Sequence, residues 1–141
     1  MSVIRLEIVT PTRPGISRDA EFVVAPTTAG EVGILPGHAP LMARLATGVL
    51  RFTADGKTTK IAVSDGYLEV MPKKVIVLAE AAELAADIDV ERALASKRRA
   101  EERLHASLRD RNDFVRASAS LRRAANRLQV AGEHEVDQKH D

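Results

Sequence analysis

Apolar side chains change their spacing near residue 88, and this change constrains the fold more than any other feature of the sequence. In residues 3–10, Ile4, Leu6 and Ile8 alternate with charged neighbours, which is the period-two pattern of a half-buried strand. After residue 88, apolar residues recur at every third or fourth position, as they do on one face of a helix. The two patterns in series predict an α+β chain, with strands first and helices second.

Short segments with β-rich composition follow one another through the first part of the chain: 20–26, 48–53, 58–63, 67–71 and 75–80. Asp55-Gly56 supplies the positive φ angles of a tight hairpin, and Pro72 marks another turn. Turns every eight to twelve residues or so are typical of an antiparallel β-sandwich or barrel. With 3% aromatic residues and no Trp, its core must consist of Val, Ile, Leu and Ala. From Ala79 on, the run AEAAELAAD is rich in alanine and glutamate, and it predicts that the β structure ends in this segment.

The second part of the chain predicts an antiparallel pair of helices. Asp89 is a good N-cap, and Ile88 is placed to contact Ala93 across the first turn. Residues 108–113 break the pattern, and we expect Asn112 or Asp113 to cap the second helix and Gly132 to end it. The expected apolar faces are Val90, Ala93, Leu94, Lys97, Ala100, Leu104 and Leu108 in the first helix, and Phe114, Ala117, Leu121, Ala124, Ala125 and Leu128 in the second.

These patterns predict a β-sandwich domain over residues 1–86, a helical hairpin over 87–130 and a flexible polar tail over 131–141. Charge is distributed unevenly among them, because residues 89–128 carry 11 Lys and Arg against 6 Asp and Glu. Most of these cations are arginines, which suit bidentate contacts with carboxylates or phosphates. An acidic partner is one interpretation, and a solvated helix surface is the other. Because alanine buries little area, we expect the hairpin to hold only weakly to whatever it packs on.

Several chemistries lack the residues they need. No cysteine is present, and His38, His105, His134 and His140 do not have metal-ligand spacing, so we expect neither a metal site nor an enzyme. His38 lies in the Gly- and Pro-rich stretch GEVGILPGHAP without a neighbouring nucleophile, which favours a rigid corner over a catalytic loop. The glycine spacing matches no phosphate-binding motif. The chain shows neither a signal peptide nor a membrane span, and we expect no direct membrane insertion.

Two function classes remain open from the residues alone. One is a protein-binding module that carries a basic helical hairpin, and the other is a nucleic-acid binder that uses the same hairpin. The second class lacks aromatic residues interleaved with the cations and has no zinc or RNA-binding motif.

Three stretches, GEVGILPGHAPLMARLATGVLRF, SDGYLEV and IDVERA, closely resemble the epsilon subunit of rotary F-type ATP synthases, over residues 3–128. The resemblance implies a non-catalytic subunit of the central stalk, peripheral on the cytoplasmic face of the bacterial inner membrane. Its partners would be the gamma subunit, the ring of c subunits, and the catalytic beta and alpha subunits, with no nucleic acid. Such subunits couple proton-driven rotation to ATP synthesis, and many inhibit ATP hydrolysis by extending the hairpin into the catalytic head.

The resemblance also implies candidate site residues. Glu31 and His38 would contact the stalk and rotor, and basic helix residues would contact an acidic segment of the beta subunit: Arg109, Arg111, Arg116, Arg122, Arg123 and Arg127. No cofactor is required, but some family members bind ATP as a regulatory ligand through a motif of the form I/L-D-x-x-R-A with further contacts. The matching positions here are Glu83, Ile88, Asp89, Arg92, Ala93, Arg99 and Arg122. Asn126 stands where another arginine would be expected, and the motif residues also make a complete helix start.

Overall fold

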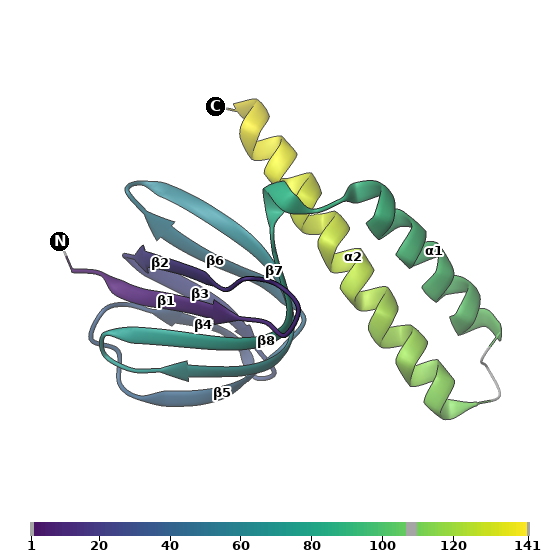
Figure 1. Ribbon diagram of the computed structural model, residues 1–141, viewed down its shortest axis with the longest axis horizontal. Coiled ribbons are helices and arrows are strands. Elements are labelled where there is room, and N and C mark those ends of the chain that lie inside the picture. Colours follow the sequence, from purple (N-terminus) through teal and green to yellow (C-terminus); the bar gives the residue numbers. More distant parts are fainter. Residues whose placement is uncertain (1, 107–109, 141) are drawn as a thin grey trace. The chain divides into compact units, whose positions relative to one another are not determined.

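The computed structural model describes the backbone of residues 2–106 and 110–140, and side chains as far as residue 133. The chain divides into two compact units, a strand unit (Met1–Leu84) and a hairpin unit (Ala85–Asp141) (Figure 1). The α+β class and the order of a β-sandwich before two helices are confirmed.

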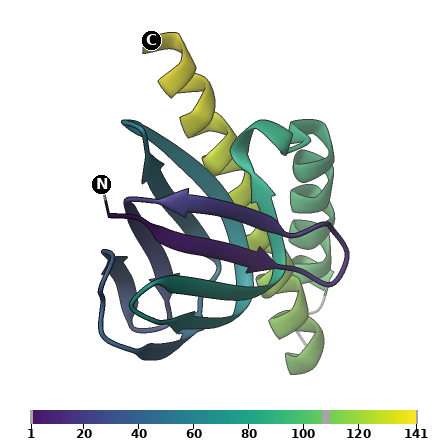
Figure 2. The ribbon, with the colours of Figure 1, turned by 60° about the vertical axis from the view of Figure 1, so that its left-hand side comes forward.

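Eight strands are described in the strand unit: β1 (Ile4–Val9), β2 (Ile16–Ala20), β3 (Phe22–Thr27), β4 (Gly30–Ile34), β5 (Leu41–Leu45), β6 (Gly48–Ala54), β7 (Lys57–Val70) and β8 (Lys74–Leu84). Hydrogen bonds join them in the order β2-β1-β8-β7-β5-β3-β4, with β6 pairing with both β3 and β7. The described pairs are antiparallel, except that β1 and β8 run parallel. Figure 2 shows β1 and β2, in purple, lying side by side.

β7 is one long strand, so the prediction of separate strands at 58–63 and 67–71 is wrong. Its first half pairs with β6 and its second half with β5, which folds the sheet over into a sandwich. The change of partner occurs at Asp65, with φ 41°, and Gly66, with φ 154°. Glycine is required at the second position, because a Cβ there would overlap the carbonyl oxygen of Leu78.

The predicted hairpin between β6 and β7 is confirmed. Ala54 pairs with Lys57, and the two loop residues Asp55 and Gly56 have φ angles of 53° and 77°. Positive φ at both positions is the geometry that a two-residue hairpin needs. The turn after β7 is also confirmed, since the Met71 amide donates to the Lys74 carbonyl at 2.8 Å.

β8 extends to Leu84, so the expected fading of β structure from Ala79 is wrong. Leu84, Glu83 and Ala82 pair with Ile61, Ala62 and Val63 of β7. Alanine and glutamate favour helices by only a few tenths of a kcal/mol per residue over ordinary residues, so a continuous ladder outweighs this local preference.

The core of the strand unit consists mainly of aliphatic side chains, as predicted, but the aromatic Phe52 is also buried in it. The largest fully buried ones include Ile4, Leu6 and Ile8 of β1 together with Leu50, Ile61 and Leu68. Fully burying such a side chain contributes roughly 1.5–3 kcal/mol. The alternation seen in residues 3–10 is therefore the inward and outward alternation of an actual strand.

The hairpin unit contains a short 3₁₀ turn, η1 (Ala85–Asp87), and the helices α1 (Val90–Ala106) and α2 (Arg111–His140). Asp89 caps α1 as predicted, since its Oδ1 accepts the amide of Arg92 at 3.0 Å. The cap of α2 is Asp110, whose Oδ1 accepts the amides of Asn112 at 2.9 Å and Asp113 at 3.3 Å. The assignment of this cap to Asn112 or Asp113 is therefore wrong.

α2 continues through Gly132 to His140, so Gly132 does not end the helix. The helix covers most of the segment for which the composition predicted a polar tail. Glycine in a helix interior costs about 1 kcal/mol relative to alanine, which a helix of this length tolerates.

The contact face between α1 and α2 consists mainly of alanine, as predicted for Ala93, Ala100, Ala117 and Ala124, which are all buried. The face differs from expectation at Ala125, which is exposed, and at Phe114, Leu94 and Val90, which are 42%, 39% and 39% exposed. Val130 and Ala131 are buried although the pattern did not single them out. Leu108 of the expected face lies outside the described residues.

We expect Leu68→Ala to lower the free energy of unfolding by about 2–5 kcal/mol, because it removes a fully buried side chain and leaves a cavity. Leu78→Ala is the matched control, since Leu78 lies next to this position in the β7–β8 ladder but is 52% exposed. Urea unfolding of both variants measures the difference, and equal losses would contradict the placement of the core.

Candidate functional site

Glu31, predicted to contact the rotor, lies on β4 and forms a bidentate ion pair with Arg51 of β6. The guanidinium donates to Oε1 at 3.3 Å and to Oε2 at 3.2 Å, across the intervening strand β3. The two side chains remain 57% and 38% exposed. Bidentate geometry fixes the orientation of the carboxylate but leaves it accessible to a partner.

His38 lies in the corner between β4 and β5 and is half-buried. Its Nδ1 donates to the carbonyl oxygen of Ala39 at 2.6 Å, and its amide donates to Leu35 at 3.1 Å. The Gly37 amide donates to Pro72 at 2.7 Å, and Gly37 itself has φ 87°. A backbone carbonyl therefore orients the His38 ring. A catalytic base would instead be oriented by a carboxylate and would lie next to a nucleophile. This geometry favours the rigid corner inferred from the sequence.

Four of the candidate nucleotide-binding residues lie at the start of α1: Ile88, Asp89, Arg92 and Ala93. Asp89 already accepts the Arg92 amide as an N-cap, and Ile88 and Ala93 are buried. The Arg92 side chain is exposed. The geometry is compatible with both interpretations of this motif, a helix cap and a nucleotide site. The cap uses one oxygen of the Asp89 carboxylate, so the other oxygen and the Arg92 guanidinium can still contact a ligand.

Glu83 belongs to the strand unit, on β8. Its side chain is 12% exposed, and its carboxylate lies 3.9 Å from the guanidinium of Arg13. Arg99 and Arg122 belong to the hairpin unit, on α1 and α2.

Arg99 lines a groove of about 190 Å³ between α1 and α2. The sequence interpretation did not group Arg99 with the other residues that line this groove. The lining residues are Ser96, Arg99, Ala100 and Arg103 from α1, with Ser120, Arg123 and Arg127 from α2. Arg99 donates to Ser96 Oγ and Arg123 donates to Ser120 Oγ, both at 3.1 Å. A sequence signal existed, because Ser-x-x-Arg-x-x-x-Arg occurs at 96–103 and again at 120–127. We call these six serine and arginine residues the arginine groove.

The structure separates the candidate inhibitory arginines into two groups. Arg111, Arg116 and Arg122 have exposed side chains, whereas Arg123 and Arg127 are half-buried in the arginine groove. Arg109 lies outside the described residues.

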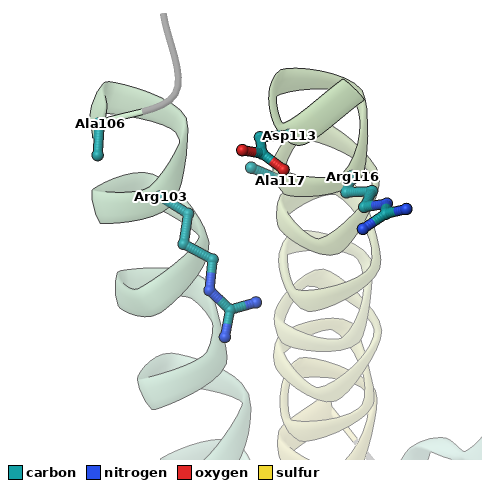
Figure 3. Close-up of a pocket in the computed structure, with 5 residues that line it drawn as sticks. All are labelled: Arg103, Ala106, Asp113, Arg116 and Ala117. Carbon is teal, nitrogen blue, oxygen red and sulfur yellow. The ribbon is translucent and has the colours of Figure 1, made fainter. Parts of the chain in front are cut away.

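A second cavity, of about 420 Å³, lies between α1 and α2 and is lined by Arg103, Ala106, Asp113, Arg116 and Ala117. Figure 3 shows the Arg103 side chain extending from α1 toward α2 and the Asp113 carboxylate directed back toward α1. The lining mixes two cations with one anion, so it carries less positive charge than the arginine groove. Among the described residues, no group of three His, Cys, Asp or Glu side chains could hold a metal ion.

The strand unit exposes an apolar row that the sequence interpretation also missed. Val9 pairs with Leu78, and Leu78 pairs with Tyr67, so the three side chains lie on one face of adjacent strands. They are 48%, 52% and 59% exposed, and Met42 on the neighbouring strand β5 is 73% exposed. We call Val9, Leu78, Tyr67 and Met42 the outer apolar row. Exposed apolar residues that cluster in this way mark interaction surfaces. No helix in the described part of the chain is long and apolar enough to cross a membrane.

Comparison with protein families matches both units of the chain. Residues 3–85 match the beta-sandwich domain of the ATP synthase delta/epsilon chain, and residues 86–132 match its long alpha-helix domain. The ATP synthase epsilon chain of Bacillus velezensis is 49% identical over 132 residues, which cover 94% of this chain and 99% of that one. The epsilon chain of Desulforamulus reducens is 50% identical, over 90% of this chain and 96% of that one.

A solved structure gives the same result for the fold. A chain in the OSCP/F1/c-ring structure of the Euglena gracilis mitochondrial ATP synthase superposes with a TM-score of 0.72 at 21% identity. The match covers 86% of this chain and 77% of that one. The comparisons give no support to the nucleic-acid alternative. The chain therefore belongs to the ATP synthase delta/epsilon chain family and is an epsilon chain, a non-catalytic subunit of that complex.

Proposed function

We propose that this epsilon chain is a rotor subunit that binds gamma and the ring of c subunits through its strand unit and restrains ATP hydrolysis through its hairpin unit. The observation that carries the proposal is the family match across both units, because each half of the role requires one of them. The complex would lie on the cytoplasmic face of a bacterial inner membrane, with this subunit peripheral to it.

The outer apolar row is the surface that we assign to gamma. A permanent rotor contact requires a desolvated apolar centre, and large, well-packed side chains such as tyrosine carry much of the binding energy at such centres. Tyr67, Leu78 and Met42 provide these side chains on a rigid sheet. We assign two polar groups of the strand unit to the ring of c subunits: Glu31 on β4, which the Arg51 ion pair orients, and His38 in the corner between β4 and β5, whose ring a backbone hydrogen bond orients.

We expect Tyr67→Ala and Leu78→Ala each to weaken binding to isolated gamma subunit by about 1–2 kcal/mol or more, measured by isothermal titration calorimetry. Val3→Ala is the control, since Val3 is 48% exposed but lies outside the row. Thermal unfolding should show all three variants to be folded. Unchanged binding by both row variants would remove this surface from the proposal.

The hairpin unit provides the inhibitory half of the proposal. Exposed guanidinium groups on α2, those of Arg111, Arg116 and Arg122, would pair with carboxylates of an acidic segment of the beta subunit. An acidic protein surface suits these residues because arginine forms bidentate pairs at low entropic cost.

Removing all residues after Asp87 should raise the rate of ATP hydrolysis by the reconstituted complex, because the inhibitory element is lost. A full-length variant with Arg111, Arg116 and Arg122 replaced by glutamine should raise it in the same direction and keep the helices. Far-UV circular dichroism checks the helices of this second variant. If hydrolysis stays at the original rate in both complexes, the hairpin does not inhibit.

We also propose that ATP binds at the start of α1, with Asp89 and Arg92 as the principal contacts. Ile88, Ala93, Arg99, Arg122 and Glu83 complete the candidate set. A ligand that binds the folded hairpin alone would stabilise it by about 2.7 kcal/mol at a hundredfold excess over its dissociation constant. That free energy would be large beside the small apolar area of an alanine contact face.

Asp89→Asn separates the two roles of this residue, because asparagine caps a helix about as well as aspartate but has no charge. We expect the variant to keep its helix content and to bind ATP more weakly in a calorimetric titration. If full-length protein with Asp89 intact gives no heat at millimolar ATP, Asp89 acts only as a cap.

A further inference from the structure

The last residues of β8 have a sequence that favours a helix. In AEAAELAAD, residues 79–87, every residue except the final aspartate is alanine, glutamate or leucine, which rank among the strongest helix formers. Alanine and glutamate are also depleted in strands. The segment nevertheless forms the end of β8 and then η1, shortly before α1 begins. Its local preference therefore conflicts with its structure, and pairing with β7 holds it in the sheet.

This part of β8 is paired along one edge. β1 pairs with β8 as far as Leu78, so among the described strands the residues that follow have β7 as their ladder partner and no strand on the other side. β7 itself is bound on its far side by β6, which pairs with it from Lys57 to Val63. Residues 81–84 can therefore leave the ladder while β7 stays in the sheet.

The β7–β8 ladder is interrupted where this segment begins. Asp65 and Glu80 do not pair with each other, and Asp65 has φ 41°. On one side of the break, residues 66–70 pair with residues 75–79, next to the turn. On the other side, residues 61–64 pair with residues 81–84, and we call these pairs the outer ladder. Parts of a sheet that are divided in this way can open separately.

The outer ladder contains weak points. Ser64, which pairs with Ala81, is 4% exposed, and in the described part of the chain its Oγ has no hydrogen-bond partner. A hydroxyl that is buried without a partner costs free energy, which the surrounding contacts must offset. Residues 81–84 add only the small side chain of Ala82 and the partly buried side chain of Leu84 to the core. Opening of the outer ladder therefore exposes little apolar area.

An ion pair connects this segment to the loop between β1 and β2. The guanidinium of Arg13 lies 3.9 Å from the carboxylate of Glu83, whose side chain is 12% exposed. A carboxylate with so little exposure is stabilised by a nearby cation. Arg13 is held in position by its loop, because Thr10 Oγ1 donates to the Arg13 carbonyl at 3.3 Å and Pro14 restricts the backbone after it.

We propose that residues 81–87 form a strand-to-helix switch, in which they leave the outer ladder and extend α1 at its N-terminal end. The Arg13–Glu83 ion pair acts as the latch that keeps them in the strand. In helical form, Ala82 and Ala86 continue the buried face of α1 that contains Ala93, because they precede it by about three and two helical turns. Glu83 then lies in the first turn, where a carboxylate interacts favourably with the helix dipole.

The switch changes how the hairpin is connected to the strand unit. α1 gains residues 81–89, about nine residues or roughly 13 Å of helix, and the cap at Asp89 is given up. The hairpin is then carried on a continuous helix instead of on a strand end followed by η1. This inference rests on the strand ladder and does not depend on the rotor, inhibitory or nucleotide proposals.

The test compares full-length R13E with full-length R18E. R13E places a second carboxylate beside Glu83, whereas R18E reverses an exposed charge on β2, where Arg18 donates to the Ser17 carbonyl. In R13E, hydrogen exchange of the amides that bond across the outer ladder should become faster by about tenfold or more. Residues 66–70 and 75–79 should keep their protection. The NMR Cα shifts of residues 81–87 should move toward helical values, and R18E should match the original chain in both measurements.

A second variant, R13E/A86G, distinguishes a switch from simple fraying. Ala86 is exposed and lies outside the ladder, so A86G lowers helix preference without removing a strand pair. The double variant should keep the fast exchange but lose most of the helical shift. R13Q replaces R13E if protection of residues 66–70 shows that the sandwich has unfolded. Random-coil shifts for residues 81–87 in R13E, unchanged exchange there, or an equal loss of protection along the whole β7–β8 ladder would overturn the proposal.

Discussion

The pairing of β7 with β8 is the interaction on which the rest of the strand unit depends. The ladder runs from Val70 and Val75 at the turn to Ile61 and Leu84, and both strands are shared with other parts of the sheet. β8 also pairs in parallel with β1, and β7 holds β6 and β5 in succession. Because each strand contributes alternating Val, Ile and Leu side chains to one core, loss of this ladder would separate both layers of the sandwich. The bend at Asp65 and Gly66 allows the ladder to continue while the sheet folds over.

The hairpin unit follows a different physical principle. Its helices touch through buried alanines, which bring the backbones close but remove little apolar area from water. The same close approach places the two Ser-x-x-Arg-x-x-x-Arg stripes against one groove. Packing and electrostatics are therefore linked. Larger residues at Ala100 or Ala124 would push the helices apart and increase the distances between the arginines of the two stripes. A small apolar contact area combined with concentrated positive charge suits the proposed control by an acidic partner.

The two units of this epsilon chain offer different kinds of binding surface. The strand unit offers three fixed features: the outer apolar row, Glu31 on β4, which an ion pair orients, and His38 in the corner between β4 and β5, which a backbone hydrogen bond orients. Rigidity suits the rotor contact proposed for this unit, because a compliant contact would transmit torque poorly. The hairpin unit offers surfaces whose exposure depends on what the arginines bind. The exposed guanidinium groups of Arg111, Arg116 and Arg122 are available to an external partner, whereas Arg123 and Arg127 are half-buried in the arginine groove.

The sequence by itself determined the class of the fold, the hairpin at Asp55-Gly56, the cap at Asp89 and the alanine face of the helices, because these depend on local periodicity and on turn and cap chemistry. It also carried the motifs that identify the family. Only the tertiary structure decided that β8 continues through AEAAEL, because pairing with β7 outweighs helix preference, and that Asp110 caps α2. The outer apolar row and the arginine groove likewise required three dimensions. Val9, Tyr67 and Leu78 are far apart in sequence and meet only through strand register, and Arg103 meets Arg127 only because two helices fold back on each other.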